Sequence, residues 1–173
     1  KRHYDRVAKG LDVPETYRPP QRRHTVVVLV GSLNRGVIDA LTYAGNTDNF
    51  RPFEDDPRFR FVKGDICDRD AVLDALAGHD QVVHFAAESH VDRSIVSPDE
   101  FVRTNCGGTN VMCDVARQVG VERFLHISTD EVYGSIDEGS FTETDVLAPR
   151  SPYSAAKAGS DLIALAYQET HGL

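Results

Sequence analysis

The stretch Arg123–Gly134, RFLHISTDEVYG, is an apolar strand that ends in two hydroxyl residues and two acids. A helix follows, with Ser151 as its cap and Pro152 in its first turn. An apolar strand joined to a helix is the repeating unit of a parallel sheet, and ligands bind at the carboxyl ends of such strands. The stretch therefore indicates an α/β protein with a polar site where this strand ends.

The same alternation of strands and helices extends through the chain from residue 25. Each predicted strand is apolar over most of its length, which is typical of a parallel sheet covered on both faces. The other predicted strands are Thr25–Val30, one ending at Asp39, Arg58–Val62 and Asp80–Ala87. The predicted helices are Asp68–Ala77, Ser97–Gly120 and Ser151–His171. The pair Gly107-Gly108 inside the second helix predicts close packing there, since glycine otherwise destabilises a helix.

Length and composition favour one globular domain, because 173 residues with 40% hydrophobic content can form a substantial core. The chain has no run of about 18 apolar residues, so we expect no membrane span. Its charged N-terminal part lacks the apolar segment of a secretory signal. Cys67, Cys106 and Cys113 have no C-x-x-C spacing, which predicts reduced, buried thiols in a cytosolic protein. The seven His residues lack metal-ligand spacing, and we expect no metal site.

The net charge of −8 is unevenly distributed. Residues 1–24 have a net charge of +4 and the remainder has −12. An acidic body argues against nucleic acid as a partner. The basic segment contains three prolines and little apolar periodicity, which predicts a disordered or foreign tail. The alternative is a phosphate-binding arm.

Tyr153 and Lys157 lie four positions apart, so they share one face of the last helix. An ammonium group beside a phenol favours the phenolate and is expected to lower the pKa of the tyrosine. A phenolate can take the proton of a substrate alcohol while hydride leaves the same carbon. Most such pairs are ordinary surface residues, and it is the position after the polar strand end that favours catalysis here.

Several long blocks, in this order, resemble the extended short-chain dehydrogenase/reductase superfamily, and within it the dTDP-glucose 4,6-dehydratase family. The resemblance covers about residues 37–173. The matching blocks are Asp39–Asn46 (DALTYAGN), Lys63–Asp68 (KGDICD), His84–Ser94 (HFAAESHVDRS), Thr104-Asn105, Ser128–Gly134 and Ser151–Lys157. The resemblance implies an incomplete Rossmann-like, doubly wound parallel sheet with helices on both faces. It also implies NAD as the cofactor, a dTDP-linked sugar as the substrate, a cytoplasmic location and a homodimer.

The implied activity is that of a hydro-lyase in deoxysugar biosynthesis, which converts dTDP-glucose to dTDP-4-keto-6-deoxyglucose and recycles NAD internally. Tyr153 would take the proton of the sugar 4-hydroxyl as hydride passes from carbon 4 to NAD. Glu131 would then remove the carbon 5 proton, and Asp130 would protonate the leaving 6-hydroxyl before hydride returns to carbon 6. Thr129 would hold the 4-hydroxyl, and Lys157 would also bind the nicotinamide ribose. Without the resemblance, Asp130 and Glu131 could equally cap or solvate a loop.

The resemblance also implies the cofactor contacts. Asp39 would accept hydrogen bonds from the adenosine ribose, and an acid there favours NAD over NADP because it would repel the 2′-phosphate. Asp65 and Ile66 would flank the adenine. The other implied cofactor-binding residues are Ala40, Leu41, Thr42, Phe85, Ala86, Ala87, Ser89, Thr104, Tyr153 and Lys157. The implied substrate-binding residues are Ser89, Thr129, Asp130 and Glu131.

The sequence departs from the family at the glycine-rich turn. Relatives have Gly-x-x-Gly-x-x-Gly before a helix whose N-terminus receives the pyrophosphate. Here only Gly31 and Gly36 lie between the strand at Thr25–Val30 and Asp39, and eight residues are too few for a parallel crossover. Either the first helix is missing or Thr25–Val30 is the second strand. Arg35 could replace the lost helix N-terminus as a cation.

We expect two parts, a basic segment over residues 1–24 and a partial NAD-binding domain over residues 25–173. Because the chain stops at Leu173, just after the helix that carries Tyr153, we expect no substrate-binding lobe in it. Three functions stay open. The chain is a fragment or aberrant form of a 4,6-dehydratase, a degenerate homologue that binds without turnover, or a related epimerase or dehydratase that uses a UDP or GDP sugar. Only dehydration removes the mass of one water from the sugar.

Overall fold

The computed structural model describes residues 27–31 and 33–173. The predicted basic segment, residues 1–24, and the first two residues of the strand predicted at Thr25–Val30 lie outside the described residues. The strands are β1 (Val27–Val30), β2 (Arg35–Asp39), β3 (Phe59–Lys63), β4 (Gln81–His84) and β5 (Arg123–His126). The helical elements are η1 (Thr47–Phe53), α2 (Arg69–Leu76), α3 (Val91–Val96), α4 (Pro98–Phe101), η2 (Val102–Gly108), α5 (Thr109–Val119), η3 (Asp130–Tyr133) and α6 (Pro152–His171).

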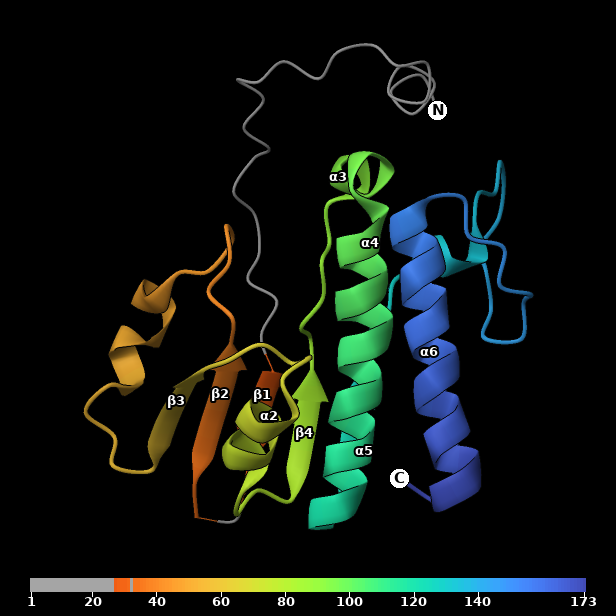
Figure 1. Ribbon diagram of the computed structural model, residues 1–173. Coiled ribbons are helices and arrows are strands. Elements are labelled where there is room, and N and C mark those ends of the chain that lie inside the picture. Colours follow the sequence, from red (N-terminus) through yellow and green to blue (C-terminus); the bar gives the residue numbers. More distant parts are fainter. Residues whose placement is uncertain (1–26, 32) are drawn as a thin grey trace.

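The five strands form one sheet in the order β3-β2-β1-β4-β5, which is the order of the first five strands in a doubly wound nucleotide-binding sheet (Figure 1). The Rossmann-like α/β class is therefore confirmed. The pairs β2–β3 and β4–β5 are parallel, as predicted. The central strand β1 runs antiparallel to both of its neighbours, so the prediction of parallel pairing is wrong for this one strand.

The link between β1 and β2 explains the reversal. The four residues Gly31–Asn34 close a hairpin, in which the amide of Gly31 donates to the carbonyl of Asn34 at 3.0 Å. A parallel crossover needs about a dozen residues, so a link of this length permits only an antiparallel return. The turn lies at the amino edge of the parallel strands, and Val27, the first described residue of β1, lies at their carboxyl edge beside Ile38 and His84.

One face of the sheet carries the core. Val27, Leu29, Ile38 and Val82 alternate with other residues along their strands, are at most 1% exposed, and pack with α2 and α5. Figure 1 shows α2, α5 and α6 in a row, and contacts join α2 to α5 and α5 to α6. The large helices therefore cover one face together.

The second face is covered less completely. The Phe50 ring of η1 lies 5.2 Å from that of Phe61 on β3, so η1 covers this edge of the second face. Val28 and Val83 alternate with core residues and are part-buried, and Leu125 is 55% exposed. Helical elements thus lie on both faces as predicted, but only a short one lies on the second.

The helix predicted at Ser97–Gly120 is continuous and contains a π-helical segment, η2, between α4 and α5. It ends at Gly120, which adopts a φ of 78°. A Cβ on Gly108 would lie 2.4 Å from Cδ1 of Ile66, so the close packing expected of the glycine pair is confirmed at Gly108. Such π-helical segments occur frequently at functional sites.

The last helix, α6, begins and ends where the sequence predicts. The side chains of Ser151 and Ser154 each accept a hydrogen bond from the other's amide at 3.0 Å, which forms a capping box. Pro152 occupies the first turn, and Gly172 ends the helix with a φ of 72°. This cap fixes the turn that carries Tyr153.

The central position of β1 can be tested with two leucines of the hairpin. Leu29 is 1% exposed and packs in the core, whereas Leu33 is 82% exposed in the turn. We expect Leu29→Ala to lower the free energy of unfolding by about 2–5 kcal/mol, since it deletes buried methyl groups and leaves a cavity. Leu33→Ala is the matched control and should change it by less than about 0.5 kcal/mol. Equal effects in urea unfolding would contradict a buried central β1.

Candidate functional site

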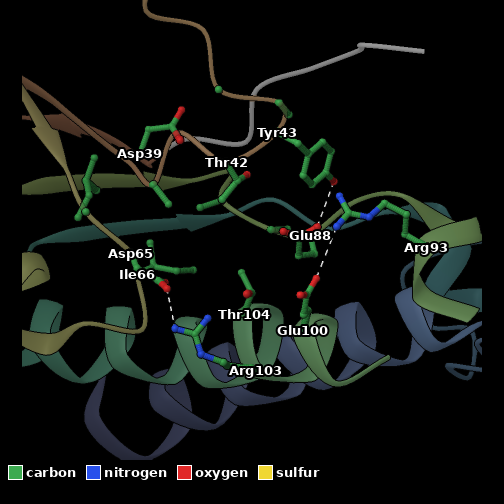
Figure 2. A pocket seen from close by; sticks show the side chains of 17 residues that line it. Asp39, Thr42, Tyr43, Asp65, Ile66, Glu88, Arg93, Glu100, Arg103 and Thr104 are labelled. Carbon is green, nitrogen blue, oxygen red and sulfur yellow. Dashed lines mark hydrogen bonds and ion pairs between the residues drawn. The ribbon is translucent and has the colours of Figure 1, made fainter. Parts of the chain in front are cut away.

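A cavity of about 310 Å³ lies at the carboxyl edge of β2, β3 and β4 (Figure 2). The loops after these strands form one side, and residues of α3, α4 and η2 close the other. Parallel strands end at a common edge, so their loops meet there, as in other open α/β sheets. Eight of the predicted cofactor-binding residues line the cavity, namely Asp39, Ala40, Thr42, Asp65, Ile66, Ala86, Ala87 and Thr104.

Asp39 ends β2 and is 8% exposed. Its carboxylate accepts a hydrogen bond from the amide of Leu41 at 2.7 Å, and Leu41 has a φ of 49°, which non-glycine residues rarely adopt. This tight turn, visible beside Thr42 in Figure 2, orients the acid at the cavity wall. A carboxylate at the end of the second strand is the group that binds ribose hydroxyls in dinucleotide-binding sheets.

Asp65, after β3, is held by an ion pair across the cavity. Nη2 of Arg103 lies 2.6 Å from Oδ2 of Asp65, and the amide of Cys67 donates to Oδ1 at 2.9 Å. Burial raises the pKa of Asp65, but these hydrogen bonds and the charge of Arg103 outweigh burial and hold the pKa below its usual value. Asp65 therefore stays ionised.

A second polar group joins the loop after β2 to the loop after β4 and α3. The hydroxyl of Tyr43 donates to Glu88 at 3.0 Å, and the guanidinium of Arg93 lies 4.0 Å from the centre of the Tyr43 ring and 3.6 Å from Glu100. Burial and the charge of Glu88 raise the pKa of Tyr43 to about 12. Figure 2 shows this group and the Asp65–Arg103 pair on either side of Thr104.

The π-helical segment anchors the loop that follows β4. Asn105 is 1% exposed, its side-chain oxygen accepts from the amide of Glu88 at 2.7 Å, and its side-chain nitrogen donates to the carbonyl of Glu88 at 3.0 Å. Both backbone polar groups of Glu88 are therefore held by a single side chain. This clamp positions the segment that contributes Ala86 and Ala87 to the cavity.

The predicted catalytic residues meet at the same edge, where β5 ends and α6 begins. Thr129 caps η3, and its hydroxyl accepts from the amide of Glu131 at 3.3 Å. Burial raises the pKa of Tyr153, the side chain of Thr129 opposes this, and the charges of Glu131 and Asp130 raise it further. Burial raises the pKa of Glu131, and Asp130 raises it further. A carboxylate with a raised pKa is a stronger base for proton abstraction.

Lys157 is directed at the backbone just after β5. It is 4% exposed, and its ammonium donates to the carbonyl of Ile127 at 2.5 Å. The pKa of Tyr153 is raised, chiefly by burial, so the predicted lowering by Lys157 is wrong for this structure. The reason is that the ammonium is directed at a backbone carbonyl. Burial lowers the pKa of Lys157 itself, and Asp161 opposes this.

The remaining predicted residues do not line the cavity. Leu41 contributes its amide to Asp39, Phe85 has a side chain that is 42% exposed, and Ser89 lies half-buried on the loop between β4 and α3. Sequence reasoning missed five charged or aromatic residues of the cavity: Tyr43, Glu88, Arg93, Glu100 and Arg103. Three of them, Tyr43, Glu88 and Arg93, lie inside the sequence blocks that resemble the family. Their position in these blocks was the signal that could have identified them.

The structure argues against the alternative that Arg35 replaces the lost helix N-terminus. Arg35 begins β2, and Asp39 at the cavity ends it, so the two lie at opposite edges of the sheet. The guanidinium of Arg35 donates to the carbonyls of Gly31 and Asn34, both at 2.8 Å. Because β1 is reversed, its first residue and not its last lies at the carboxyl edge of the parallel strands. Among the described elements, no helix therefore follows β1 at that edge.

Other site classes find no support in the described residues. No group of three or more His, Cys, Asp or Glu among them is arranged to hold a metal ion. The three cysteines are free, and burial raises the pKa of Cys67 to about 11 and that of Cys113 to about 12. None of the described helices combines the length and the apolar character needed to cross a membrane.

The sheet order, the acid after the second strand and the Tyr153/Lys157 pair define an α/β domain of the short-chain dehydrogenase type. A family profile described as GDP-mannose 4,6 dehydratase matches residues 24–173, and the chain belongs to this family. The dTDP-glucose 4,6-dehydratase of Streptomyces niveus is 58% identical over 137 residues, which are 79% of this chain and 41% of that enzyme. The low-salt glycan biosynthesis protein Agl12 of Haloferax volcanii is 57% identical over 79% of this chain and 44% of its own length.

Solved structures agree with these relatives. The dTDP-glucose 4,6-dehydratase DesIV of Streptomyces venezuelae, crystallised with NAD and dTDP bound, has a TM-score of 0.80 and 55% identity, covering 83% of this chain and 45% of that one. The UDP-Glc/GlcNAc 4-epimerase of Campylobacter jejuni has a TM-score of 0.72 and 27% identity, covering 79% and 42%. The chain thus spans less than half the length of these relatives.

The raised pKa of Glu131 gives a stability signature. A carboxyl group whose pKa is higher in the folded state stabilises the fold below its unfolded pKa, and this contribution is lost as pH rises through the folded pKa. We therefore expect Glu131→Gln to raise the melting temperature at pH 7 and to have a smaller effect at pH 4. Glu138→Gln, an exposed neighbour, is the control and should show no such difference. A Glu131→Gln effect that is the same at both pH values in thermal melts would count against a buried, perturbed Glu131.

Proposed function

We propose that this chain is the cofactor-binding and catalytic part of a sugar-nucleotide 4,6-dehydratase that acts on dTDP-glucose. The observation that carries the proposal is the meeting of Thr129, Asp130 and Glu131 with Tyr153 at one edge of the sheet. Elimination of water across carbons 5 and 6 needs a base and an acid beside a group that can oxidise carbon 4. Two acids and a tyrosine satisfy that need together, and the dTDP-glucose dehydratases at 55–58% identity support the choice of substrate.

The residues divide the reaction between them. Thr129 holds the sugar 4-hydroxyl beside Tyr153, and the phenolate form of Tyr153 accepts its proton. Glu131, whose pKa is raised by burial, removes the proton from carbon 5, which the carbon 4 ketone acidifies. Asp130 is exposed and protonates the departing 6-hydroxyl. NAD, when bound, supplies the hydride acceptor and donor for the cycle. The product is a 4-keto-6-deoxy sugar nucleotide.

The described residues fit the nucleoside part of NAD but not its pyrophosphate. Asp39 is the residue that we propose for the ribose diol, and Asp65 and Ile66 line the same cavity. The cavity also contains Glu88 and Glu100, and both of its arginines are ion-paired to acids. With β1 reversed, no described helix N-terminus faces a phosphate there. We therefore propose Asp39, Asp65 and Ile66 as residues that bind the adenosine part of NAD. We propose no residue of the described part of the chain as a contact of the pyrophosphate.

We also propose that the chain acts as a homodimer in the cytoplasm. Leu162 and Leu165 on α6 are 57% and 53% exposed, and Val102 on η2 is 53% exposed, which leaves apolar surface on the outer helices. Free cysteines suit a reducing compartment. For the domain organisation we retain a partial cofactor-binding domain over residues 25–173.

The reversed β1 favours a second candidate function, a homologue that binds a nucleoside and does not turn over sugar. It keeps the carboxylates of the cavity but lacks the turn that would hold a complete dinucleotide. An epimerase is a third reading, supported only by the 4-epimerase structures at lower identity. These candidates differ in the mass of the product.

A chimeric enzyme distinguishes the three candidate functions. Residues 37–173 of this chain would replace the matching segment of the Streptomyces niveus enzyme, which supplies the missing turn and the rest of its length. We expect the chimera to convert dTDP-glucose to a product lighter by one water, measured by mass spectrometry. Tyr153→Phe should slow it by about 10²–10⁴-fold, because the general base is lost. A product of unchanged mass indicates an epimerase, and no product from a folded chimera indicates the binding module.

A further inference from the structure

Three consecutive residues at the end of β5 are each tied to α6. Nε2 of His126 lies 3.0 Å from Oδ1 of Asp161, the carbonyl of Ile127 accepts from Lys157 at 2.5 Å, and the hydroxyl of Ser128 donates to Oδ2 of Asp161. Asp161 thus binds two of the three through separate oxygens. The next residue, Thr129, begins the predicted catalytic segment.

This linkage matters because the predicted catalytic set comes from two separate elements. Thr129 and the two acids after it belong to the β5–η3 segment, whereas Tyr153 and Lys157 belong to α6. A shift of α6 along β5 would move the two halves apart. Asp161 lies one turn after Lys157 on the same face of α6, so its hydrogen bonds fix the register between the halves.

Asp161 is also the acid that acts on Lys157. Its side chain is 15% exposed and that of His126 is 10% exposed, so the interaction lies in a poorly solvated region. The other ionisable groups around this position are His84 on β4, His126 on β5 and Tyr153 on α6, together with the acids of η3 that act on Tyr153. Among them Asp161 is the one whose charge favours the ammonium form of Lys157.

We propose that Asp161 is a positioning residue of this site, which fixes the end of β5 against α6 through Ser128 and His126, one helical turn after the buried Lys157. This inference rests on the proposed function only where it predicts an effect on catalysis. In that function Lys157 must remain an ammonium group to bind a ribose. No hydrogen bond joins Asp161 to Tyr153, but its charge raises the pKa of Tyr153 and favours the ammonium form of Lys157.

The first test measures the pKa of the Lys157 ammonium in the full chain by NMR with labelled lysine. The chain has four lysines, so the buried one can be assigned from a Lys157→Met sample. Asp161→Asn keeps the size of the side chain and removes its charge, and we expect the Lys157 pKa to fall by about one unit. Glu169→Gln removes an exposed charge from the same helix and should leave it unchanged. Asp161→Glu should restore most of the difference.

A second measurement needs no variant at position 161 and holds if Asp161→Asn fails to fold. Ser128→Ala removes one hydrogen bond between the end of β5 and Asp161, and we expect it to displace the Lys157 signal of the folded chain. An unchanged Lys157 pKa in folded Asp161→Asn, or an unchanged Lys157 signal in folded Ser128→Ala, would overturn the proposal.

These outcomes are independent of turnover. If the chimera described above makes no product while Lys157 responds to Asp161, the proposed function fails and the positioning role stands. If the chimera is active, Asp161→Asn in it should displace the basic limb of the pH–rate profile to lower pH, along with the Lys157 pKa. An active chimera whose Asp161→Asn variant keeps the original basic limb would contradict a role in catalysis.

Discussion

The four-residue link between β1 and β2 is the constraint on which the rest of the structure depends. It is too short for a crossover, so the central strand turns back and runs against its neighbours. The strand still buries Val27 and Leu29 in the core, because an antiparallel strand presents the same alternation of side chains to one face. The sheet therefore keeps its order and core while losing the helix that normally follows its first strand.

The loss is confined to one part of the site. Asp39, Asp65 and the clamp made by Asn105 depend on β2, β3, β4 and the central helix, whose directions are unchanged. The predicted catalytic segment depends on β5 and α6, which the hydrogen bonds of Asp161 to His126 and Ser128 join. Among the described residues, the turn after β1 is a hairpin at the far edge of the sheet, so it offers no phosphate-binding turn at the cavity. The proposed nucleoside pocket and the predicted catalytic edge are therefore not joined by a helix after β1 in the described part of the chain.

Much of this could be predicted from sequence, because local patterns determine it. Ser151, Pro152 and Gly172 delimit α6 as expected, and Gly108 marks the close approach of Ile66. The direction of β1 could not be read from its apolar composition, which is the same for parallel and antiparallel central strands. The charged side of the cavity, with Arg93 and Arg103, was missed because ion pairs across elements leave no periodic signal. The pKa of Tyr153 was mispredicted because spacing on a helix does not reveal that Lys157 turns toward Ile127.

The most direct test of this account is a calorimetric titration of the folded chain with adenosine and with NAD⁺ under identical conditions. A pocket that binds the nucleoside and gains little from the pyrophosphate predicts similar dissociation constants for the two ligands, and Asp39→Asn should weaken both. Binding of NAD⁺ more than about a hundredfold tighter than adenosine, a difference of about 2.7 kcal/mol, would contradict the account, because it would require a pyrophosphate site that the described residues do not form.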